Sequence, residues 1–491
     1  MKAVAPVCLA IALLAQACAL GGEQDEIDST AGESHNGGGS SFTTPLRIPP
    51  VLAPTRTDAT TDYYDLEMRP GSVQIRPSGN PTPIWGYNGL YPGPTIVATR
   101  GRQVQVTQRN SLPENMTVHN HGHKVAASSD GHPTDYIVPG ASKTYFYPND
   151  QLAGTYWYHD HTMDLTGDHV YRGLAAFYII RDPAEDALNL PSGAYDVPLL
   201  IQDKTFNSNN TLYYDPDPDR DGFIGDIPVV NGVEKPYFNV ANRKYRFRVL
   251  NGANARRFTL AFRKSGTSTN LSFQVIGSDG GLLAAPVTVT TLEISPAERY
   301  DIVVNFNRGD PLNTNYVLAD GGDRDWSGSG ELLQFRFNRS ESDPSNVPAT
   351  LSSITRYQRS QAVGTYDIQF DEDNGVWELN GVPFDPARID VTTRLGQVYI
   401  WRLINNSRRM HPFHKHLTEF QVLSQGGSRW GGPGPGPTAV EAGWKDTVPV
   451  EDGEMVEIIF TNETFTGTYV FHCHRLEHED HRMMLQEQTQ P

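Results

Sequence analysis

Cysteine is nearly absent from this sequence. Only three of the 491 residues are cysteine, and two of them, Cys8 and Cys18, lie near the N-terminus. Both belong to a segment with the pattern of an export signal, so we expect Cys473 to have no partner for a disulfide. The mature chain is therefore not a disulfide-stapled fold, and its single thiol is available as a metal ligand.

Positive charge is also scarce. Lys and Arg total 40 against 57 Asp and Glu, which gives a formal net charge of -17 and a sequence pI of about 5.3. Nothing in this balance favours a polyanionic partner, so we expect no nucleic acid to bind. Charged residues make up only 20% of the chain, whereas Gly (45) and Pro (35) are abundant. This composition is typical of a turn-rich, mostly β protein, and the length predicts about three domains.

The N-terminus has the pattern of an export signal. The apolar run Val4–Leu14 is too short to span a membrane, and a small-residue cleavage site ends at Ala17, so residues 1–17 are predicted to be a signal peptide. We expect a periplasmic or extracellular protein. Cys18 lies where a lipid acceptor would, so a lipid anchor at the cell envelope is an open alternative. Residues 18–45 are predicted to form a flexible, Gly-, Ser- and acid-rich tether.

One pattern occurs three times along the chain. A β-rich run ends in Asn, and later a turn introduces a second β-rich run. The first runs are Gly101–Asn110, Lys244–Asn251 and Gly396–Asn405, and the second runs are Val138–Tyr147, Pro296–Val304 and Val450–Phe460. Repetition at this scale, with alternating apolar positions, predicts an all-β fold of three related β-sandwich domains. We place them at residues 46–183, 184–345 and 346–491, and we expect a monomer.

The outer two copies resemble each other more closely. Gly154–His161 can be aligned with Gly467–His474, and His119-Asn120-His121 can be aligned with His414-Lys415-His416. Asp160 stands where Cys473 stands, so the first domain is expected to lack a thiolate-ligated metal. The middle copy has no histidine, since none occurs between His169 and His411.

Histidine is concentrated in the outer copies. Ten of the 15 histidines fall in four clusters: His119 and His121; His159 and His161; His411, His414 and His416; His472, His474 and His478. A lone histidine is more often a surface or core residue, but paired spacing in two related domains predicts metal binding. Neighbours on a strand face opposite sides, so if Cys473 faces one metal, His472 and His474 face another. A thiolate, imidazoles and a thioether close together are the ligands of a blue-copper centre.

With these motifs the sequence resembles the three-domain multicopper oxidases, and within them the branch of bacterial spore-coat laccases and bilirubin oxidase. The resemblance runs from about Pro45 to Leu485. Its most telling stretches are Trp157–His161, Arg243–Val249, Gly277–Leu283, Pro296–Asp301, Gly443–Thr447, and His472–His474 through Glu477–Asp480. The resemblance implies cupredoxin-like Greek-key domains and four copper ions: one type 1, one type 2 and two type 3.

The resemblance also implies a ligand for each copper. The type 1 ligands would be His411, Cys473 and His478, with Met483 axial. The type 2 ligands would be His119 and His414, and the type 3 ligands would be His121, His159, His161, His416, His472 and His474. Because Met484 adjoins Met483, the axial choice depends on the family spacing of ten residues from the cysteine, and both could instead be core fillers.

Two carboxylates have a possible catalytic role. Acidic residues at the positions of Asp130 and Glu479 support proton delivery to oxygen in this branch; otherwise each would be an ordinary surface carboxylate.

The histidines outside the ligand spacing, His123, His132, His169 and His481, are expected to lie beside the ligands or in solvent. The loop Asp217–Gly222 imitates the start of a calcium loop, but Pro228 occupies the position of the bidentate Glu, so an ordinary turn is the alternative.

The resemblance implies a laccase-like oxidase. It would couple one-electron oxidation of small phenolic or amine substrates to the four-electron reduction of dioxygen to water. Oxidation of Cu(I) or Mn(II), in copper homeostasis for example, and oxidation of bilirubin are the alternatives. The chain has only eight Met and no Met-rich segment outside Met483-Met484, which favours organic substrates.

Overall fold

A computed structural model describes residues 42–215, 222–322, 330–373 and 375–491. The predicted signal peptide, Cys18 and most of the tether lie outside these residues, as does most of the loop with the calcium-like pattern. In the part of the chain that is described, no helix is both long and apolar enough to cross a membrane.

The described residues form six β-sheets, two from each predicted domain range, and no sheet mixes strands of two ranges. The first sandwich pairs a sheet of order β1-β2-β5-β7, with β3 on β2, and a sheet of order β4-β9-β8-β6. Its strands are β1 (Arg56–Thr57), β2 (Thr61–Val73), β3 (Thr82–Tyr87), β4 (Ile96–Thr99), β5 (Gln103–Asn110), β6 (Val118–His121), β7 (Ser142–Tyr147), β8 (Gly154–Asp160) and β9 (Ala175–Arg181).

The second sandwich has the larger sheets. One has the order β13-β12-β10-β15-β21-β18-β19, with β11 on β10, and the other has the order β14-β23-β22-β16-β17, with β20 on β16. Its strands are β10 (Asp196–Phe206), β11 (Leu212–Tyr213), β12 (Ile227–Val230), β13 (Val233–Glu234), β14 (Tyr237–Ala241), β15 (Lys244–Asn251), β16 (Phe258–Lys264), β17 (Asn270–Leu271), β18 (Phe273–Ser278), β19 (Gly281–Val289), β20 (Thr291–Ile294), β21 (Arg299–Asn305), β22 (Asn315–Asp320) and β23 (Gly330–Arg339).

The third sandwich has two sheets, of order β25-β24-β27-β31-β29 and β26-β33-β32-β28-β30. Its strands are β24 (Ala362–Asp373), β25 (Val376–Leu379), β26 (Val391–Arg394), β27 (Val398–Asn405), β28 (His411–Lys415), β29 (Gln421–Gly427), β30 (Thr447–Val450), β31 (Met455–Thr461), β32 (Gly467–Cys473) and β33 (Met484–Gln490). The described helices are α1 (Thr166–Arg172), α2 (Pro183–Asp186) and α3 (Leu476–Asp480), with 3₁₀ turns at Ala127–Ser129, Gly193–Tyr195 and Arg359–Gln361.

Local pattern explains the strands. In β5 the residues Val104, Val106 and Gln108 are buried while their neighbours are at least partly exposed, which is the period of two that a strand needs to cover one side of a core. Equivalent sheets of the outer sandwiches contain a parallel pair between strands distant in sequence, β2 with β5 and β24 with β27. These crossovers give the Greek-key arrangement, and the expectation of three cupredoxin-like β-sandwiches is confirmed.

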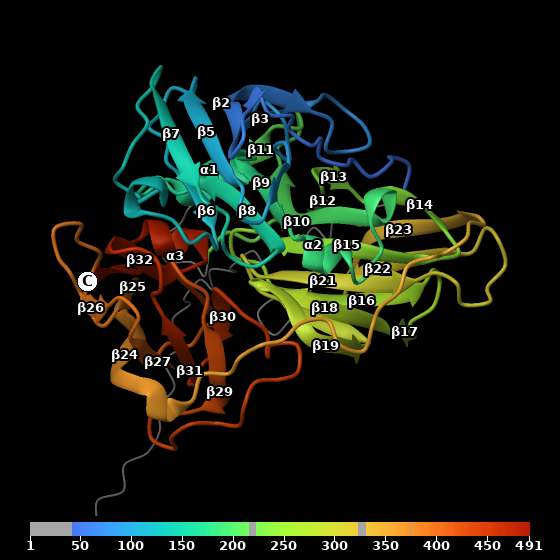
Figure 1. Cartoon of the computed structure of the whole chain (residues 1–491). Helices are drawn as coiled ribbons and strands as arrows, with labels where there is room; N and C mark the ends of the chain where they lie inside the picture. The colour runs from blue at the N-terminus through green and yellow to red at the C-terminus, as the bar shows by residue number, and fades with distance from the viewer. Residues whose placement is uncertain (1–41, 216–221, 323–329, 374) are drawn as a thin grey trace, which may run out of the picture. The chain divides into compact units, whose positions relative to one another are not determined.

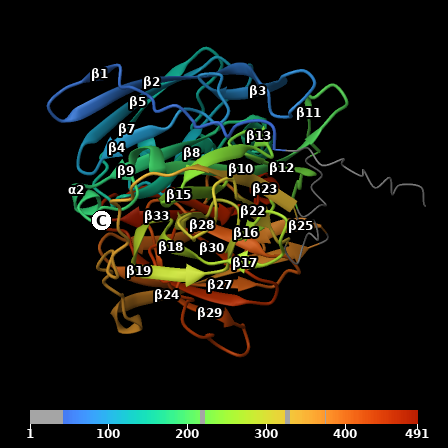
Figure 2. The ribbon, with the colours of Figure 1, turned by 90° about the vertical axis from the view of Figure 1, so that its right-hand side faces the viewer.

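The first and third sandwiches face each other with the sheets that contain the histidines. In both ribbon views, β2, β5 and β7 lie on one outer side and β24, β27 and β29 on the other, with β8 and the sheet of β32 and β33 between them (Figures 1 and 2). Helix α1 of the first range packs on α3 of the third.

An apolar cluster joins the sandwiches. It combines residues of all three ranges, including Trp157, Leu250 and Leu476, all nearly inaccessible to solvent. Each fully buried large apolar side chain contributes about 1.5–3 kcal/mol, so the docking of the sandwiches is part of the folded state. Leu46, at the predicted boundary between tether and first domain, packs in the core of the second sandwich, and Pro45 bridges to Tyr237 of β14.

Candidate metal centre

Four short strands, two in each outer sandwich, carry the paired histidines or end directly before them. In β6 and β8, His119 lies opposite His159, and in β28 and β32, His414 lies opposite His472. All four strands are buried on both faces at these positions. The two sandwiches therefore present their histidines with the same cross-strand register.

Three of the predicted type 3 ligands converge through the same ring atom. His161 Nε2 lies 3.2 Å from His416 Nε2, which lies 3.3 Å from His472 Nε2. One histidine comes from the first sandwich and two come from the third, and all three are buried. This trio, His161, His416 and His472, could hold one metal ion.

The other three predicted type 3 ligands form a second group. The ring centroids of His121, His159 and His474 lie 5.1 to 5.8 Å apart. Neither ring nitrogen of His474 has a hydrogen-bond partner among the described residues. The six predicted type 3 ligands thus divide into two trios, each made from both outer sandwiches.

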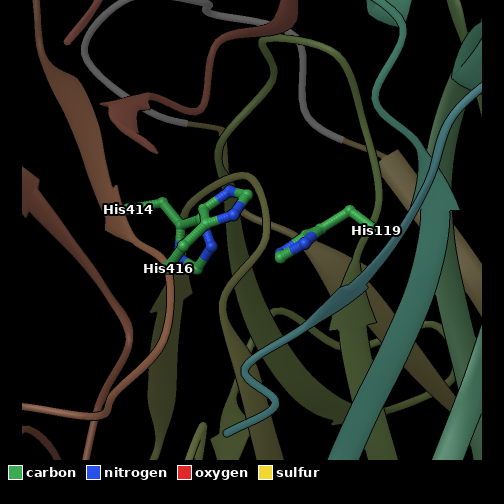
Figure 3. A group of neighbouring side chains, drawn as sticks. All are labelled: His119, His414 and His416. Atoms are coloured by element: carbon green, nitrogen blue, oxygen red, sulfur yellow. The ribbon is translucent and has the colours of Figure 1, made fainter. Parts of the chain in front are cut away.

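His119 and His414, the predicted type 2 ligands, lie at the same junction. Figure 3 shows His119 pointing toward His414 and His416 from the opposite side, and potential ligand atoms of these three residues lie within 4.8 Å of one another. His416 is thus within reach of two groups. All eight paired histidines of the outer sandwiches meet in one buried region.

The ring nitrogens that face this region lack protein partners. His119, His159 and His414 donate from Nδ1 to the backbone carbonyls of Asp130, Asp160 and Asp446 at 2.6 to 2.8 Å, which leaves Nε2 buried and unpaired. In His121 the roles are reversed, because Nε2 lies 3.0 Å from Asp446 Oδ1 and Nδ1 is unpaired. Buried polar atoms normally have partners, so these orphaned nitrogens fit metal coordination.

Burial also keeps the rings in the protonation state that binds metal. Desolvation lowers the pKa of His119, His121, His159, His414, His416 and His474 well below the ordinary value of 6.5. A neutral imidazole offers a lone pair, whereas an imidazolium does not. These six rings are therefore ready to bind cations across the physiological pH range. At His161 burial is outweighed by the Glu479 carboxylate, which raises the pKa of that ring, so a bound cation would have to displace a proton there.

Glu479 lies behind the trio. Its Oε1 is 3.0 Å from His161 Nδ1, its Oε2 is 3.1 Å from His472 Nδ1, and Oε1 accepts a hydrogen bond from the Thr166 hydroxyl at 2.9 Å. Burial alone would raise the pKa of Glu479, but the two histidines beside it outweigh burial and lower it well below 4.5. The carboxylate fixes the orientation of both rings.

Asp130 holds the third ring of that trio. Its Oδ2 accepts from His416 Nδ1 at 2.8 Å, while its Oδ1 is buried without a partner. Burial raises the pKa of Asp130 to about 7. Asp130 belongs to the first sandwich and His416 to the third, so this contact also crosses the junction.

The predicted type 1 ligands form a separate group inside the third sandwich. His411 Nδ1 lies 3.3 Å from Cys473 Sγ and 3.3 Å from His478 Nδ1, and Sγ lies 3.7 Å from that same Nδ1. Burial raises the pKa of the Cys473 thiol to about 12. A thiolate in this position needs a bound cation to replace its proton, and a soft thiolate with two imidazoles suits copper.

Two methionines follow this group and face different surroundings. Met483 belongs to the same apolar core as Cys473, and its backbone accepts from Cys473 N at 3.1 Å and donates to His478 O at 2.9 Å. Met484 packs instead with Phe384 and Val470. This alternation favours Met483 as the neighbour of the thiol.

Several side chains at the site were not found by sequence reasoning. The indole of Trp377 stacks on the His478 ring at a centroid distance of 4.3 Å, and the Ser407 hydroxyl lies 2.8 Å from His411 Nε2. Asp446 contacts His121, as described above. The only sequence signal for Asp446 was its place in Gly443–Thr447, a stretch that carried the resemblance without a role.

Two histidines outside the predicted ligand set differ in their surroundings. His169 links Asp160 Oδ1 at 2.8 Å to Glu114 Oε2 at 3.1 Å, so the aspartate that replaces the thiol in the first sandwich is paired. His123 is buried among tyrosines, with the Tyr178 ring at a centroid distance of 4.5 Å, and neither of its ring nitrogens has a hydrogen-bond partner among the described residues.

Comparison with known proteins agrees with this geometry. Three sequence models of the multicopper oxidase family match residues 71–185, 152–330 and 354–491. The chain is 35% identical to a laccase of Bacillus subtilis, over 90% of this chain and 97% of that protein, and 37% identical to a bilirubin oxidase of Albifimbria verrucaria, over 90% and 80%. A crystal structure of a laccase from Pediococcus acidilactici superposes with a TM-score of 0.82 at 33% identity, covering 91% of this chain and 94% of that one.

Proposed function

Because this chain belongs to the multicopper oxidase family, we propose that it is a laccase-like enzyme that oxidises small phenols and aromatic amines with dioxygen as acceptor. One observation carries the proposal. Cys473 lies with His411 and His478, while its neighbour His472 lies with His161 and His416. A thiol site is thus joined to a histidine cluster by adjacent residues of one strand.

The two groups would hold four copper ions. His411, Cys473 and His478, together with Met483, would bind the type 1 ion, and His119 and His414 would bind the type 2 ion. The trios His161, His416, His472 and His121, His159, His474 would each bind one type 3 ion. Bound copper supplies one-electron redox chemistry at the first site and the four-electron reduction of dioxygen to water at the cluster.

The chain gives electrons a covalent route between the groups, from Cys473 at the end of strand β32 to His472 within the strand and to His474 directly after it. On the substrate side, we propose entry at His478 rather than His411. The Ser407 hydroxyl already occupies His411 Nε2, whereas His478 Nε2 has no partner among the described residues. The indole of Trp377 covers His478 and would be the aromatic surface nearest a phenol.

Two carboxylates would serve proton movement. Asp130, with a pKa raised to about 7 by burial and a free Oδ1, can hold and release a proton near neutral pH. Glu479 accepts from the Thr166 hydroxyl on one side and faces two ligand rings on the other. It would both orient those rings and pass protons toward the cluster.

Metal ions are the second candidate substrate. A cavity of about 390 Å³ next to α3 is lined by Asp164, Glu477, Asp480, His481 and Arg482, and carboxylates are ligands that suit Mn(II). Most of these oxygens are engaged, however. Asp480 accepts from the backbone N–H groups of Thr166 and Gly167, and Asp164 lies 3.8 Å from Arg482. Organic substrates therefore remain the first choice.

The location and assembly state of the protein are also proposals. The signal-like N-terminus supports export to the periplasm or beyond, with Cys18 as a possible point of lipid attachment. We propose that the enzyme acts as a monomer and binds no nucleic acid, in line with its net charge of -17.

The test is to load the purified protein with copper and follow oxygen consumption with phenols, aromatic amines, bilirubin, Cu(I) and Mn(II). We expect a blue protein that reduces oxygen to water fastest with a phenol or amine. A Cys473→Ser protein is the matched control for uncatalysed oxidation. Faster turnover of Mn(II) or Cu(I) than of every organic donor would contradict the proposed substrate class, and no oxygen consumption above the control would contradict an oxidase.

A further inference from the structure

Three charged segments without any predicted ligand meet beside the histidine cluster. They are Gly277–Leu283 and Pro296–Asp301 of the second sandwich and Gly443–Thr447 of the third. At their meeting point Arg299 and Asp446 are both fully buried. The domain without histidine therefore places a charged side chain next to the cluster.

Arg299 and Asp446 form a two-point ion pair. Arg299 Nη1 donates to Asp446 Oδ1 at 2.6 Å, and Nη2 donates to Oδ2 at 2.5 Å. The guanidinium also donates to three backbone carbonyls, including that of Thr155 in β8 of the first sandwich, which Nε reaches at 2.9 Å, and its Nη1 lies 3.6 Å from Asp279 Oδ1. A fork of parallel hydrogen bonds fixes the plane of the carboxylate as well as its position.

Asp446 in turn holds one predicted ligand from each outer sandwich. Its Oδ1 accepts from His121 Nε2 at 3.0 Å, and its backbone carbonyl accepts from His414 Nδ1 at 2.8 Å. A proton on Nε2 leaves the lone pair of His121 on Nδ1, the atom that faces the cluster without a partner. The ion pair thus determines which nitrogen His121 offers.

Close backbone packing leaves little room for the pair to move. Gly122 follows His121 with a φ of +83°, and a Cβ at that position would lie 2.5 Å from Asp446 Oδ2 and 3.0 Å from Arg299 Nη2. The second and third sandwiches also approach closely at Gly443, where a Cβ would lie 2.1 Å from Ser278 Oγ. The first sandwich therefore packs tightly against the pair at Gly122.

We propose that Arg299 is a positioning residue for the copper cluster. It acts through Asp446 to fix the ring orientation and tautomer of His121, a predicted type 3 ligand, and the orientation of His414, a predicted type 2 ligand. The domain that contributes no ligand thus determines how the cluster binds copper. This inference rests on the proposed copper ligands. The competing explanation is that the pair only stabilises the contact between sandwiches.

Arg248 provides a matched control. It is also a buried arginine of the second sandwich, it forms a two-point pair with Asp196 at 2.8 Å for both contacts, and it reaches Thr155 Oγ1 of the first sandwich at 3.0 Å. Unlike the Arg299 pair, the Arg248 pair contacts no histidine in the described residues. A purely structural role predicts the same outcome for both arginines.

The experiment compares the full-length parent, Arg299→Gln and Arg248→Gln proteins. Copper affinity is measured by titration against a chelator. Electron paramagnetic resonance follows the type 2 ion, and the blue absorbance follows the type 1 ion. The unfolding midpoint of the copper-free proteins reports on folding. We expect Arg299→Gln to lose about 10- to 100-fold in cluster copper affinity, as for other residues that orient metal ligands, with a changed type 2 spectrum and parental blue absorbance. Arg248→Gln should keep the parental cluster affinity and spectrum.

Equal cluster affinities and spectra in the two variants would overturn the inference while leaving the proposed function intact. If Arg299→Gln does not fold, Arg299→Lys takes its place. Lys keeps the positive charge but cannot donate two parallel hydrogen bonds to the Asp446 carboxylate. An unchanged type 2 spectrum in Arg299→Lys would then refute the inference. A parent that binds only type 1 copper would overturn the proposed ligand set first, and the inference with it.

Discussion

Replacing Glu479 by Gln separates two roles of that side chain. The carboxylate has one oxygen 3.0 Å from His161 Nδ1 and the other 3.1 Å from His472 Nδ1. Gln has a single oxygen, so one of the two rings loses its carboxylate oxygen and faces an NH₂ group instead. His472 Nδ1 also lies 3.0 Å from the Cys473 carbonyl, so the His161 ring depends on Glu479 more than the His472 ring does. Loss of one contact with a charged group costs about 1.5–3 kcal/mol. Copper affinity of the trio should fall by about 10- to 100-fold.

The second role appears once copper is saturating. We expect reoxidation of the reduced Glu479→Gln protein by dioxygen to be slower than in the parent, because Gln cannot pass a proton. The defect should deepen as pH rises, since bulk protons become too scarce to replace the lost group. Stopped-flow mixing with oxygen over a series of pH values measures this, after a chelator titration has shown that the cluster is filled.

Glu477→Gln is the control for both measurements. Glu477 is a buried carboxylate of the same helix, and it accepts from Tyr214 and Asn254 rather than from a histidine. It should match the parent in cluster affinity and in reoxidation. If Glu479→Gln also matches the parent in both, Glu479 neither orients the ligands nor moves protons.

Three further results are expected at the thiol site. Cys473→Ser should lose the blue colour and the oxidase activity while keeping its fold, because a hydroxyl cannot replace the thiolate; a blue Cys473→Ser protein would refute the assignment. Met483→Leu should raise the type 1 potential in a redox titration, because a thioether stabilises oxidised copper more than an alkyl group does, whereas Met484→Leu should leave it unchanged; the reverse result would exchange their roles. Burial raises the pKa of the Cys473 thiol to about 12, so below that pH copper must displace a proton, while His411 and His478 are already neutral because burial lowers the pKa of each. Type 1 copper affinity should therefore rise about tenfold per pH unit near neutrality, and a flat profile would show that the thiol ionises before copper arrives.

The architecture could be predicted from sequence because its signals are local. Alternating apolar positions mark strands, and a motif repeated three times marks three similar domains. The alternation along His472-Cys473-His474 also predicts that the thiol and the imidazoles face different sites, and in the structure Cys473 lies with His411 while His472 lies with His416. The spacing of side chains on a strand needs no tertiary information.

Contacts between domains could not be predicted in this way. Asp446 reaches His121 only because two sandwiches dock, and Arg299 reaches Asp446 only because a third does. Sequence also does not show which trio a histidine joins, or that Glu479 faces two rings rather than solvent. Leu46 is a similar case, since its packing in the second sandwich depends on the path of the chain and not on a local pattern.

The two metal groups differ in how they depend on the outer sandwiches. The type 1 group draws His411, Cys473 and His478 from the third sandwich alone, whereas both type 3 trios and the type 2 pair need side chains from the first as well. A disturbance that parts the sandwiches by a few ångströms would dismantle the cluster and spare the blue centre. Colour is therefore a poor measure of the quality of a preparation, because a sample can be fully blue and still unable to reduce oxygen. The fraction of active enzyme has to be determined from the copper bound in the cluster.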